Sequence, residues 1–544
     1  MRKILLSVLI LIAANSFAQQ DAWVYFNDKP NAGSYLSNPL LMLSQRALDR
    51  RTAQGIPLDI KDVPVNLSYI AQVDAATDIT VMAQSKWLNA LHIRGSIQAI
   101  SALSQLSFVS QVEFADHSLN TNAAGRTAVP AKTKVIQQVK SVNKVLNTEA
   151  TFEYGISANQ IQMLNGQILH QQDYTASGKI IAILDAGFPG VNTAEPFQRL
   201  WDNAKILGGY NFVGRNDNIY SANSHGTMVL STMGGYKEGQ LVGTAPDAFY
   251  YLFITEDVAG ENPVEESYWV EAAEKADSLG VDVINSSLGY FGYDNTNYSH
   301  TYAELNGTTS FVSRGADIAF SRGMVVVVSA GNSGAGANPY ISVPADAANV
   351  LTIGAVDSSG IYTSFSSIGP TSDGRIKPDV VAQGVAAVVS NPSGQIMTAN
   401  GTSFSGPIIA GMVASLWQAL PDLTNAEIVS YIKQSASYHT NPNNQYGHGI
   451  PDFSLALTAA MALPDFKDNQ FMVYPNPVND HLFVATPKGS ATAEISLNNL
   501  LGQLVLKQTI DKASPIELGQ LQSGIYIYKI QSGSFVTTGK LIKK

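Results

Sequence analysis

The 544-residue chain contains no cysteine, carries few charges and has no long apolar run. Without cysteine, no disulfide framework can hold its domains together. Charged residues make up only 14% of the chain, and the net charge of −10 argues against nucleic acid as a partner. No stretch reaches the length of uninterrupted apolar sequence that spans a bilayer, so we predict no transmembrane helix. A chain of this length predicts about three or four domains.

Four polar residues of the central region lie at the ends of apolar segments. Asp185 and Asn332 each end a strand-like apolar run, and His225 and Ser403 each begin a helix-like pattern. In an open α/β sheet, functional groups gather outside the carboxyl ends of the strands. We therefore expect an acid, a base, a hydroxyl and an amide to lie together, as a Ser-His-Asp hydrolase requires.

The segments that carry these residues resemble the subtilisin-like serine proteases, in the same order along the chain. The resemblance rests on residues 185–187, 223–227, 283–289, 330–334, 369–380 and 401–403. It covers roughly residues 150 to 460 and implies an α/β fold of three layers with a parallel central sheet. We therefore predict a peptidase domain over residues 150–462 that acts as a serine endopeptidase on polypeptide substrates.

The resemblance also implies a role for each residue. Ser403 is the expected nucleophile, His225 the base that takes its proton, and Asp185 the acceptor that orients the imidazole. The side-chain amide of Asn332 is expected to donate to the oxyanion of the tetrahedral intermediate.

A further segment is expected to bind the substrate backbone. The backbone of Ser287, Leu288 and Gly289 resembles the edge that pairs with a substrate as an added strand. This chemistry requires no cofactor. Carboxylates and asparagines between Asp185 and His225 offer calcium ligands, but they follow no defined ligand pattern, and the sequence leaves the metal content open.

Five residues near the site depart from the family pattern. Ala186 follows the acid where Thr or Ser is more usual, and Met228 stands where a second His is common. After the nucleophile, Phe404, Ser405 and Gly406 replace the usual Met, Ala and Ser. None of them removes a proton-transfer group. The alternative hypothesis is a catalytically inactive, surface-displayed adhesive protein on a subtilisin-like scaffold.

The N-terminus favours export. A basic pair, an apolar run and small residues predict a signal peptide over residues 1–18, with a buried strand or helix as the alternative. For an exported chain, the lack of cysteine fits a bacterium better than a eukaryotic secretory route.

Residues 19–118 predict a small α+β unit. We expect strands at 22–26, 69–73 and 108–114 and helices at 37–55 and 81–91. A propeptide is usual at this position in secreted subtilisin-like enzymes, and a substrate-recruiting domain is the alternative. The polar stretch at 119–149, called the linker below, suits a processing site.

The sequence pattern changes in the last segment, 466–544, where short strand-like pieces are separated by turns. This pattern predicts a small β-sandwich. Four motifs resemble the type A sorting domain of the type IX secretion system of Bacteroidetes; they lie at 474–477, 501–503, 524–526 and 540–544. The resemblance implies the secretion machinery as a partner and a secreted or surface-attached bacterial protein. A carbohydrate-binding or adhesive sandwich is the alternative.

Overall fold

The computed structural model describes residues 19–120, 152–462, 471–474, 478, 481–485, 492–511, 516–532 and 535–543. These residues belong to two compact units, one ending at Ala460 and one formed by the C-terminal strands. The predicted signal peptide, nearly all of the linker and the Pro475-Asn476-Pro477 turn lie outside the described residues.

A parallel sheet of seven strands, in the order β13-β12-β11-β10-β5-β9-β6, forms the centre of the first unit. Its strands are β5 (Ile180–Asp185), β6 (Ile206–Asn211), β9 (Phe249–Ile254), β10 (Val283–Ser286), β11 (Val325–Ser329), β12 (Leu351–Val356) and β13 (Val380–Gln383). Most of their residues are apolar, as expected for strands that are covered on both faces.

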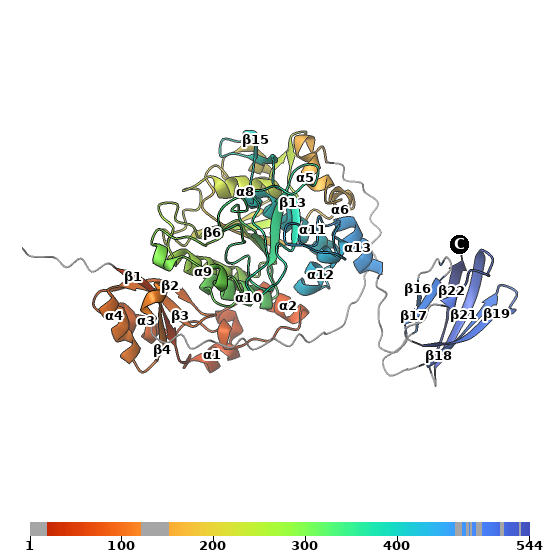
Figure 1. Cartoon of the computed structure of the whole chain (residues 1–544), viewed down its shortest axis with the longest axis horizontal. Helices are drawn as coiled ribbons and strands as arrows, with labels where there is room; N and C mark the ends of the chain where they lie inside the picture. The colour runs from red at the N-terminus through yellow and green to blue at the C-terminus, as the bar shows by residue number, and fades with distance from the viewer. Residues whose placement is uncertain are drawn as a thin grey trace, which may run out of the picture. The chain divides into compact units, whose positions relative to one another are not determined.

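Helices cover both faces of this sheet (Figure 1). The helices are α5 (Ala158–Gln162), α6 (Gln167–Gln171), α7 (Gln198–Asp202), α8 (His225–Gly234), α9 (Val264–Leu279), α10 (Phe311–Ser321), α11 (Thr402–Ala419), α12 (Asn425–Ser435) and α13 (Phe453–Ala462). Two short hairpins complete the domain: β7 (Tyr236–Lys237) with β8 (Leu241–Val242), and β14 (Ala387–Ser390) with β15 (Ile396–Ala399).

The alternation of side chains along β5 explains the three layers. Ile181 and Ile183 point into a core shared with α8 and α11, and Ala182 and Leu184 point into a core shared with α9 and α10. Successive strand residues face opposite sides of a sheet, so a wholly apolar strand needs a helix layer on each side. The predicted three-layer α/β fold is confirmed.

The N-terminal region is a four-stranded antiparallel sheet, in the order β2-β3-β1-β4, with helices on one face. Its elements are β1 (Gln20–Phe26), α1 (Ala32–Ser37), α2 (Gln45–Ala53), α3 (Leu67–Asp74), β2 (Ile79–Ser85), β3 (Ala90–Gly95), α4 (Ile97–Ala102) and β4 (Val109–Phe114). The predicted α+β character of this region is confirmed.

Two elements predicted within this region are wrong. Residues 69–73, expected to be a strand, lie in α3, because the Asn66 side chain caps that helix by accepting from the N–H groups of Ser68 and Tyr69. Residues 81–91, expected to be a helix, contain the end of β2, a turn and the start of β3. Backbone pairing with β1 outweighs the helical pattern there. Of the helix expected at 37–55, the part from Gln45 to Ala53 forms α2.

The other face of this N-terminal sheet packs on α9 and α10. Trp23 and Tyr25 of β1 enter the core beneath those helices, and the intervening residues of β1 face the region's own core. The Glu274 carboxylate accepts from the backbone N–H groups of Lys86 (3.0 Å) and Trp87 (2.9 Å) in the β2–β3 turn. The two regions of this unit therefore share a core and a set of buried polar contacts.

The second unit consists of two small sheets, in the orders β16-β17-β20 and β19-β18-β21-β22. Its strands are β16 (Met472–Tyr474), β17 (His481–Ala485), β18 (Thr492–Asn499), β19 (Leu504–Asp511), β20 (Ile516–Glu517), β21 (Gly524–Ser532) and β22 (Phe535–Lys543). Leu482, Ile495 and Ile516 come from both sheets and join one apolar core, as in a β-sandwich. Among the residues described, no helix has the length and apolar character needed to cross a membrane.

Candidate active site

An acid and a base meet where β5 ends and α8 begins. The Asp185 carboxylate is fully buried, and its Oδ1 lies 2.8 Å from Nδ1 of His225 and accepts from the Ala186 N–H at 2.7 Å. The Asn223 side chain accepts from the His225 N–H at 2.9 Å and so holds the first turn of α8. Gly187 has φ +146°, and a Cβ there would lie 2.3 Å from the carbonyl oxygen of Ser221. Only glycine lets the loop approach β5 this closely.

The electrostatics of this pair favour a charged imidazole. Burial lowers the pKa of His225, but the charge of Asp185 and the hydrogen bond to it outweigh burial and raise that pKa above its ordinary value of 6.5. The imidazole remains 27% exposed, so its other nitrogen can be reached from the cleft. The Phe404 ring, which is buried, lies 6.0 Å from the imidazole ring, centroid to centroid, and covers part of it.

Ser403 is the second residue of α11 and is only 8% exposed. Pro407 has no N–H to donate to the Ser403 carbonyl four residues earlier. The Ser287 hydroxyl donates to that carbonyl at 2.9 Å instead. The Ser403 hydroxyl donates to the carbonyl oxygen of Ser287 at 3.5 Å, and among the described contacts it forms no hydrogen bond with His225. The two serines thus hold the start of α11 against the end of β10.

The Asn332 amide is oriented by Thr402. Its Oδ1 accepts from the Thr402 N–H at 2.9 Å and from the Thr402 hydroxyl at 3.0 Å, while that hydroxyl accepts from the Gly331 N–H at 3.2 Å. Because both bonds go to the oxygen, the amide nitrogen is left to donate elsewhere, and Asn332 lines the same cleft as Ser403. Sequence reasoning missed Thr402, although it is adjacent to the predicted nucleophile.

His225, Asn332, Thr402 and Ser403 line one open cleft of about 610 Å³. Ser287, Leu288 and Gly289 form one wall of it. Their role in binding the substrate backbone stays a prediction. The Leu288 and Gly289 N–H and C=O groups form no backbone hydrogen bond with any described residue, so they are free to pair with an extended peptide. None of the described residues before the linker lines this cleft.

One departure from the family pattern has a visible consequence. Oδ2 of Asp185 is buried and has no hydrogen-bond partner among the described residues. Ala186, which follows it, has only a methyl group and no hydroxyl to donate to that oxygen.

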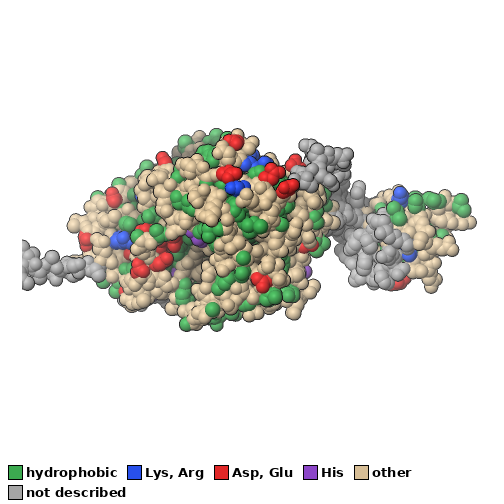
Figure 2. All heavy atoms as spheres, turned by 90° about the horizontal axis from the view of Figure 1, so that it is seen from above, with side chains coloured by type: hydrophobic (Ala, Val, Ile, Leu, Met, Phe, Trp, Pro, Cys, Tyr) green, Lys and Arg blue, Asp and Glu red, His purple; other side chains and the backbone are tan. Residues whose placement is uncertain are grey.

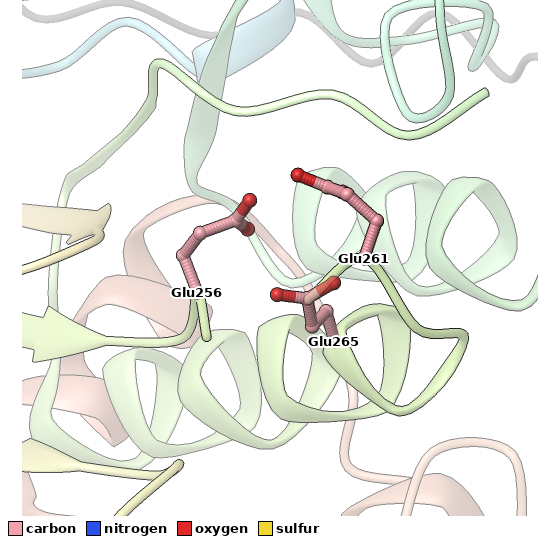
Figure 3. Close-up of side chains that lie close together, drawn as sticks. All are labelled: Glu256, Glu261 and Glu265. Carbon is pink, nitrogen blue, oxygen red and sulfur yellow. The ribbon is translucent and has the colours of Figure 1, made fainter. Parts of the chain in front are cut away.

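The described part of the chain contains one group of three side chains that could together bind a metal ion, counting His, Cys, Asp and Glu as ligands. It consists of Glu256, Glu261 and Glu265, whose carboxylate oxygens lie within 4.8 Å of one another (Figure 3). Glu256 and Glu261 line the cleft. The carboxylates between Asp185 and His225, for which the sequence left calcium binding open, form no such group among the described residues. Sequence reasoning did not single out the three glutamates.

Three segments of the chain match known protein families. Residues 176–449 match the subtilase family, residues 21–134 match the peptidase S8 propeptide domain of Bacteroidota, and residues 472–544 match the secretion system C-terminal sorting domain. The domain boundaries given above from the sequence stay predictions.

Individual proteins are also similar to this chain. Subtilisin NAT of Bacillus subtilis subsp. natto and subtilisin E of Bacillus subtilis strain 168 are each 31% identical to it over 333 residues, which is 60% of this chain and 79% of each relative. The crystal structure of MycP1 from Mycobacterium smegmatis is 24% identical, with a TM-score of 0.44, and the match covers 55% of this chain and 84% of that one.

The Asp185–His225 geometry predicts how the imidazole titrates. In the Ser403→Ala chain, the NMR titration midpoint of His225 should lie above 6.5, and Asp185→Asn should lower it below 6.5, because burial then acts alone. The signal is assigned by its loss in His225→Gln. Because the folded pKa is raised, the pair stabilises the fold fully below pH 6.5, and this contribution is lost as pH rises through the folded pKa. A midpoint at or below 6.5 in the parent chain would contradict the assignment.

Proposed function

Because the chain belongs to the subtilase family, we propose that Ser403, His225 and Asp185 are the catalytic triad of its peptidase reaction. The chain is a serine endopeptidase with a propeptide domain and a C-terminal sorting domain, and it is a secreted or cell-surface protein. The observation that carries the triad is the 2.8 Å bond from the fully buried Asp185 to the imidazole, with Ser403 in the same cleft.

The reaction is acyl transfer to Ser403 and then to water. The Ser403 Oγ attacks the peptide carbonyl carbon while its proton passes to Nε2 of His225, after rotation of the hydroxyl away from Ser287. The tetrahedral intermediate collapses, the C–N bond breaks, and His225 returns the proton to the leaving amine. Water, deprotonated by His225, then hydrolyses the ester and restores Ser403. Asp185 accepts from Nδ1 throughout and stabilises the imidazolium.

The oxyanion is stabilised by the amide nitrogen of Asn332. Thr402 is a positioning residue, because it binds the amide oxygen and so turns the nitrogen toward the cleft. A donor fixed before the reaction stabilises charge without reorganisation, which is why its orientation matters. The start of α11 adds the positive end of a helix dipole beside Ser403.

The substrate is a polypeptide in an extended conformation. It pairs with the free backbone groups of Leu288 and Gly289 as an added strand. The chemistry uses side chains alone and needs no metal or cofactor for the bond-breaking step.

The flanking domains act before and after catalysis. The N-terminal domain docks on α9 and α10, away from the cleft, and the linker behind it is the segment to be cleaved. The C-terminal sandwich is recognised by the secretion machinery. The alternative, an inactive adhesive scaffold, is disfavoured because an acid, a base, a hydroxyl and an oriented amide are all retained around one cleft.

The triad is tested by removing its members singly and together. Ser403→Ala and His225→Ala should each lower kcat for peptide hydrolysis by about 10⁶, the loss known for a subtilisin, and the double variant should be scarcely worse. The measurement is peptide cleavage by purified protein, with circular dichroism to check the fold. Near-native activity of Ser403→Ala would refute a serine mechanism.

The oxyanion role predicts an effect on turnover and not on affinity. Asn332→Ala should lower kcat by about 10²–10³ and leave KM nearly unchanged, because the amide acts when charge develops on the carbonyl oxygen. Thr402→Val, which keeps the backbone bond to Asn332 but removes the hydroxyl, should give a smaller loss of the same kind. Asn338→Ala, an exposed asparagine of the same loop, is the control. A main effect on KM would make Asn332 a substrate-binding residue instead.

A further inference from the structure

The three glutamates described above form an acidic cluster in the wall of the substrate cleft. Glu256 follows β9, Glu261 lies in the next loop, and Glu265 is in the first turn of α9. Their carboxylates point toward a common space (Figure 3). Glu256 and Glu261 line the same cleft as His225 and Ser403. On the molecular face drawn in Figure 2, acidic side chains gather in a patch with a histidine close by.

The fold holds this cluster in place without neutralising it. Glu265 is buried, and its two oxygens accept from the N–H groups of Asp257 (2.7 Å) and Asn262 (3.0 Å). Among the described residues, no lysine or arginine forms an ion pair with any of the three glutamates. Burial, followed by repulsion from neighbouring carboxylates, raises the pKa of Glu256 well above its ordinary value, and burial raises the pKa of Glu265 to about 8. A cationic group at this place would stabilise the charged form of these carboxyl groups and so lower their pKa values.

A second observation concerns two buried polar atoms beside the cluster. Tyr290 is only 1% exposed, and its hydroxyl lies close enough to Glu256 for the two polar groups to interact. Neither the Tyr290 hydroxyl nor Oε2 of Glu256 has a hydrogen-bond partner of normal geometry in the described part of the chain. Buried polar atoms are normally paired, so these two point to a ligand that binds from the cleft.

The chain itself supplies a segment of complementary charge. Between His117 and Thr148 there is no acidic residue, although the whole protein has 43 acidic against 33 basic residues. The same stretch carries five basic residues: Arg126, Lys132, Lys134, Lys140 and Lys144. They all fall in the linker, where processing is expected.

The linker begins beside the acidic cluster. Just before it, Asp116 accepts from Nδ2 of Asn297 at 3.0 Å, and His117 pairs with Glu304 at 3.0 Å. The loop that contains Asn297 also contacts the backbone beside the cluster, since the Asp294 N–H donates to the backbone carbonyl of Glu261 at 3.0 Å. An extended chain covers about 3.3–3.6 Å per residue. The residues between His117 and Lys132 are therefore enough to reach across the face of a domain.

We propose that Glu256, Glu261 and Glu265 form a subsite that binds a lysine or arginine side chain close to the scissile bond, and that the linker is its first substrate. A lysine ammonium or the planar fork of an arginine can donate to both carboxylates that line the cleft, those of Glu256 and Glu261, while Glu265 lies buried beside them. The enzyme thus selects basic peptides, beginning with its own chain. This inference rests on the proposed peptidase activity of Ser403.

The test compares two peptides on the enzyme purified after expression of the full chain. One peptide is residues 121–149, and the other has its five basic residues replaced by glutamine. We expect kcat/KM to be at least about tenfold higher for the natural peptide, as for the loss of a hydrogen bond to a charged group, with cuts next to basic residues by mass spectrometry. Glu261→Gln and Glu256→Gln should each move the ratio of the two rates toward one. Glu238→Gln, an exposed change of equal charge outside the cleft, should keep the ratio.

The outcomes separate this proposal from the peptidase assignment. Equal cleavage of both peptides by an enzyme that needs Ser403, or a ratio that survives both substitutions, refutes the subsite alone. If the substitutions leave the ratio unchanged and instead abolish a Ca²⁺-dependent rise in melting temperature, the cluster is a cation site and the proposal is wrong. Cleavage by Ser403→Ala at the wild-type rate, or no cleavage of either peptide by wild type, refutes the proposed function and the subsite with it.

Discussion

The candidate site depends on how the first turn of α11 is fixed to the ends of the parallel strands. The Thr402 carbonyl accepts from the Ser329 hydroxyl at 2.8 Å, and the Ser403 carbonyl accepts from the Ser287 hydroxyl at 2.9 Å. The second bond is available because Pro407 cannot occupy the Ser403 carbonyl. Pro407 therefore leaves the Ser403 carbonyl free to bind Ser287, which follows β10 and lines the cleft.

The same turn orders the rest of the cleft. Thr402 holds the Asn332 amide, so the position of the helix sets the direction in which the oxyanion donor points. His225 reaches this point from α8, which packs against α11 in the same core. A shift of α11 would therefore move the serine and the amide together. Such coupling predicts that substitutions at the strand ends affect activity without touching the substrate.

Charge is distributed unevenly over this architecture. Asp185 is buried against a histidine whose pKa it raises, while the three glutamates of the cleft have no basic partner among the described residues. The N-terminal domain is bound differently: Asp277 of α9, fully buried, pairs with Arg50 and Arg51. Buried pairs of this kind are costly to break singly and favour one docking geometry. The domain is thus held against α9, and none of its described residues lines the cleft.

The sequence predicted the elements whose pattern is decided locally. β5 and β11 are uninterrupted apolar runs that end in polar residues, α8 begins at the expected histidine, and α11 carries the expected serine in its first turn. In the N-terminal domain, a cap and a pairing partner decided the structure. The Asn66 cap made the β-prone residues 69–73 helical, and strand pairing made residues 81–91 part of a hairpin.

Contacts between distant segments could not be predicted in the same way. Thr402 donates to Asn332, and Ser287 donates to the Ser403 carbonyl. To predict these two hydrogen bonds, one must know which strand ends are neighbours in the sheet. The acidic cluster was missed for a related reason. Its three glutamates are close in sequence, but only the turn between β9 and α9 brings them together and directs Glu256 and Glu261 into the cleft.

The central claim is that His225 activates Ser403. A fluorophosphonate tests it directly, because its phosphorus forms a bond to a serine oxygen and releases fluoride only when that serine is activated. We expect one label per molecule, found by mass spectrometry on the peptide that contains Ser403, and no label in His225→Ala protein that remains folded. Labelling of His225→Ala at the wild-type rate, or labelling of a different serine, would contradict the account.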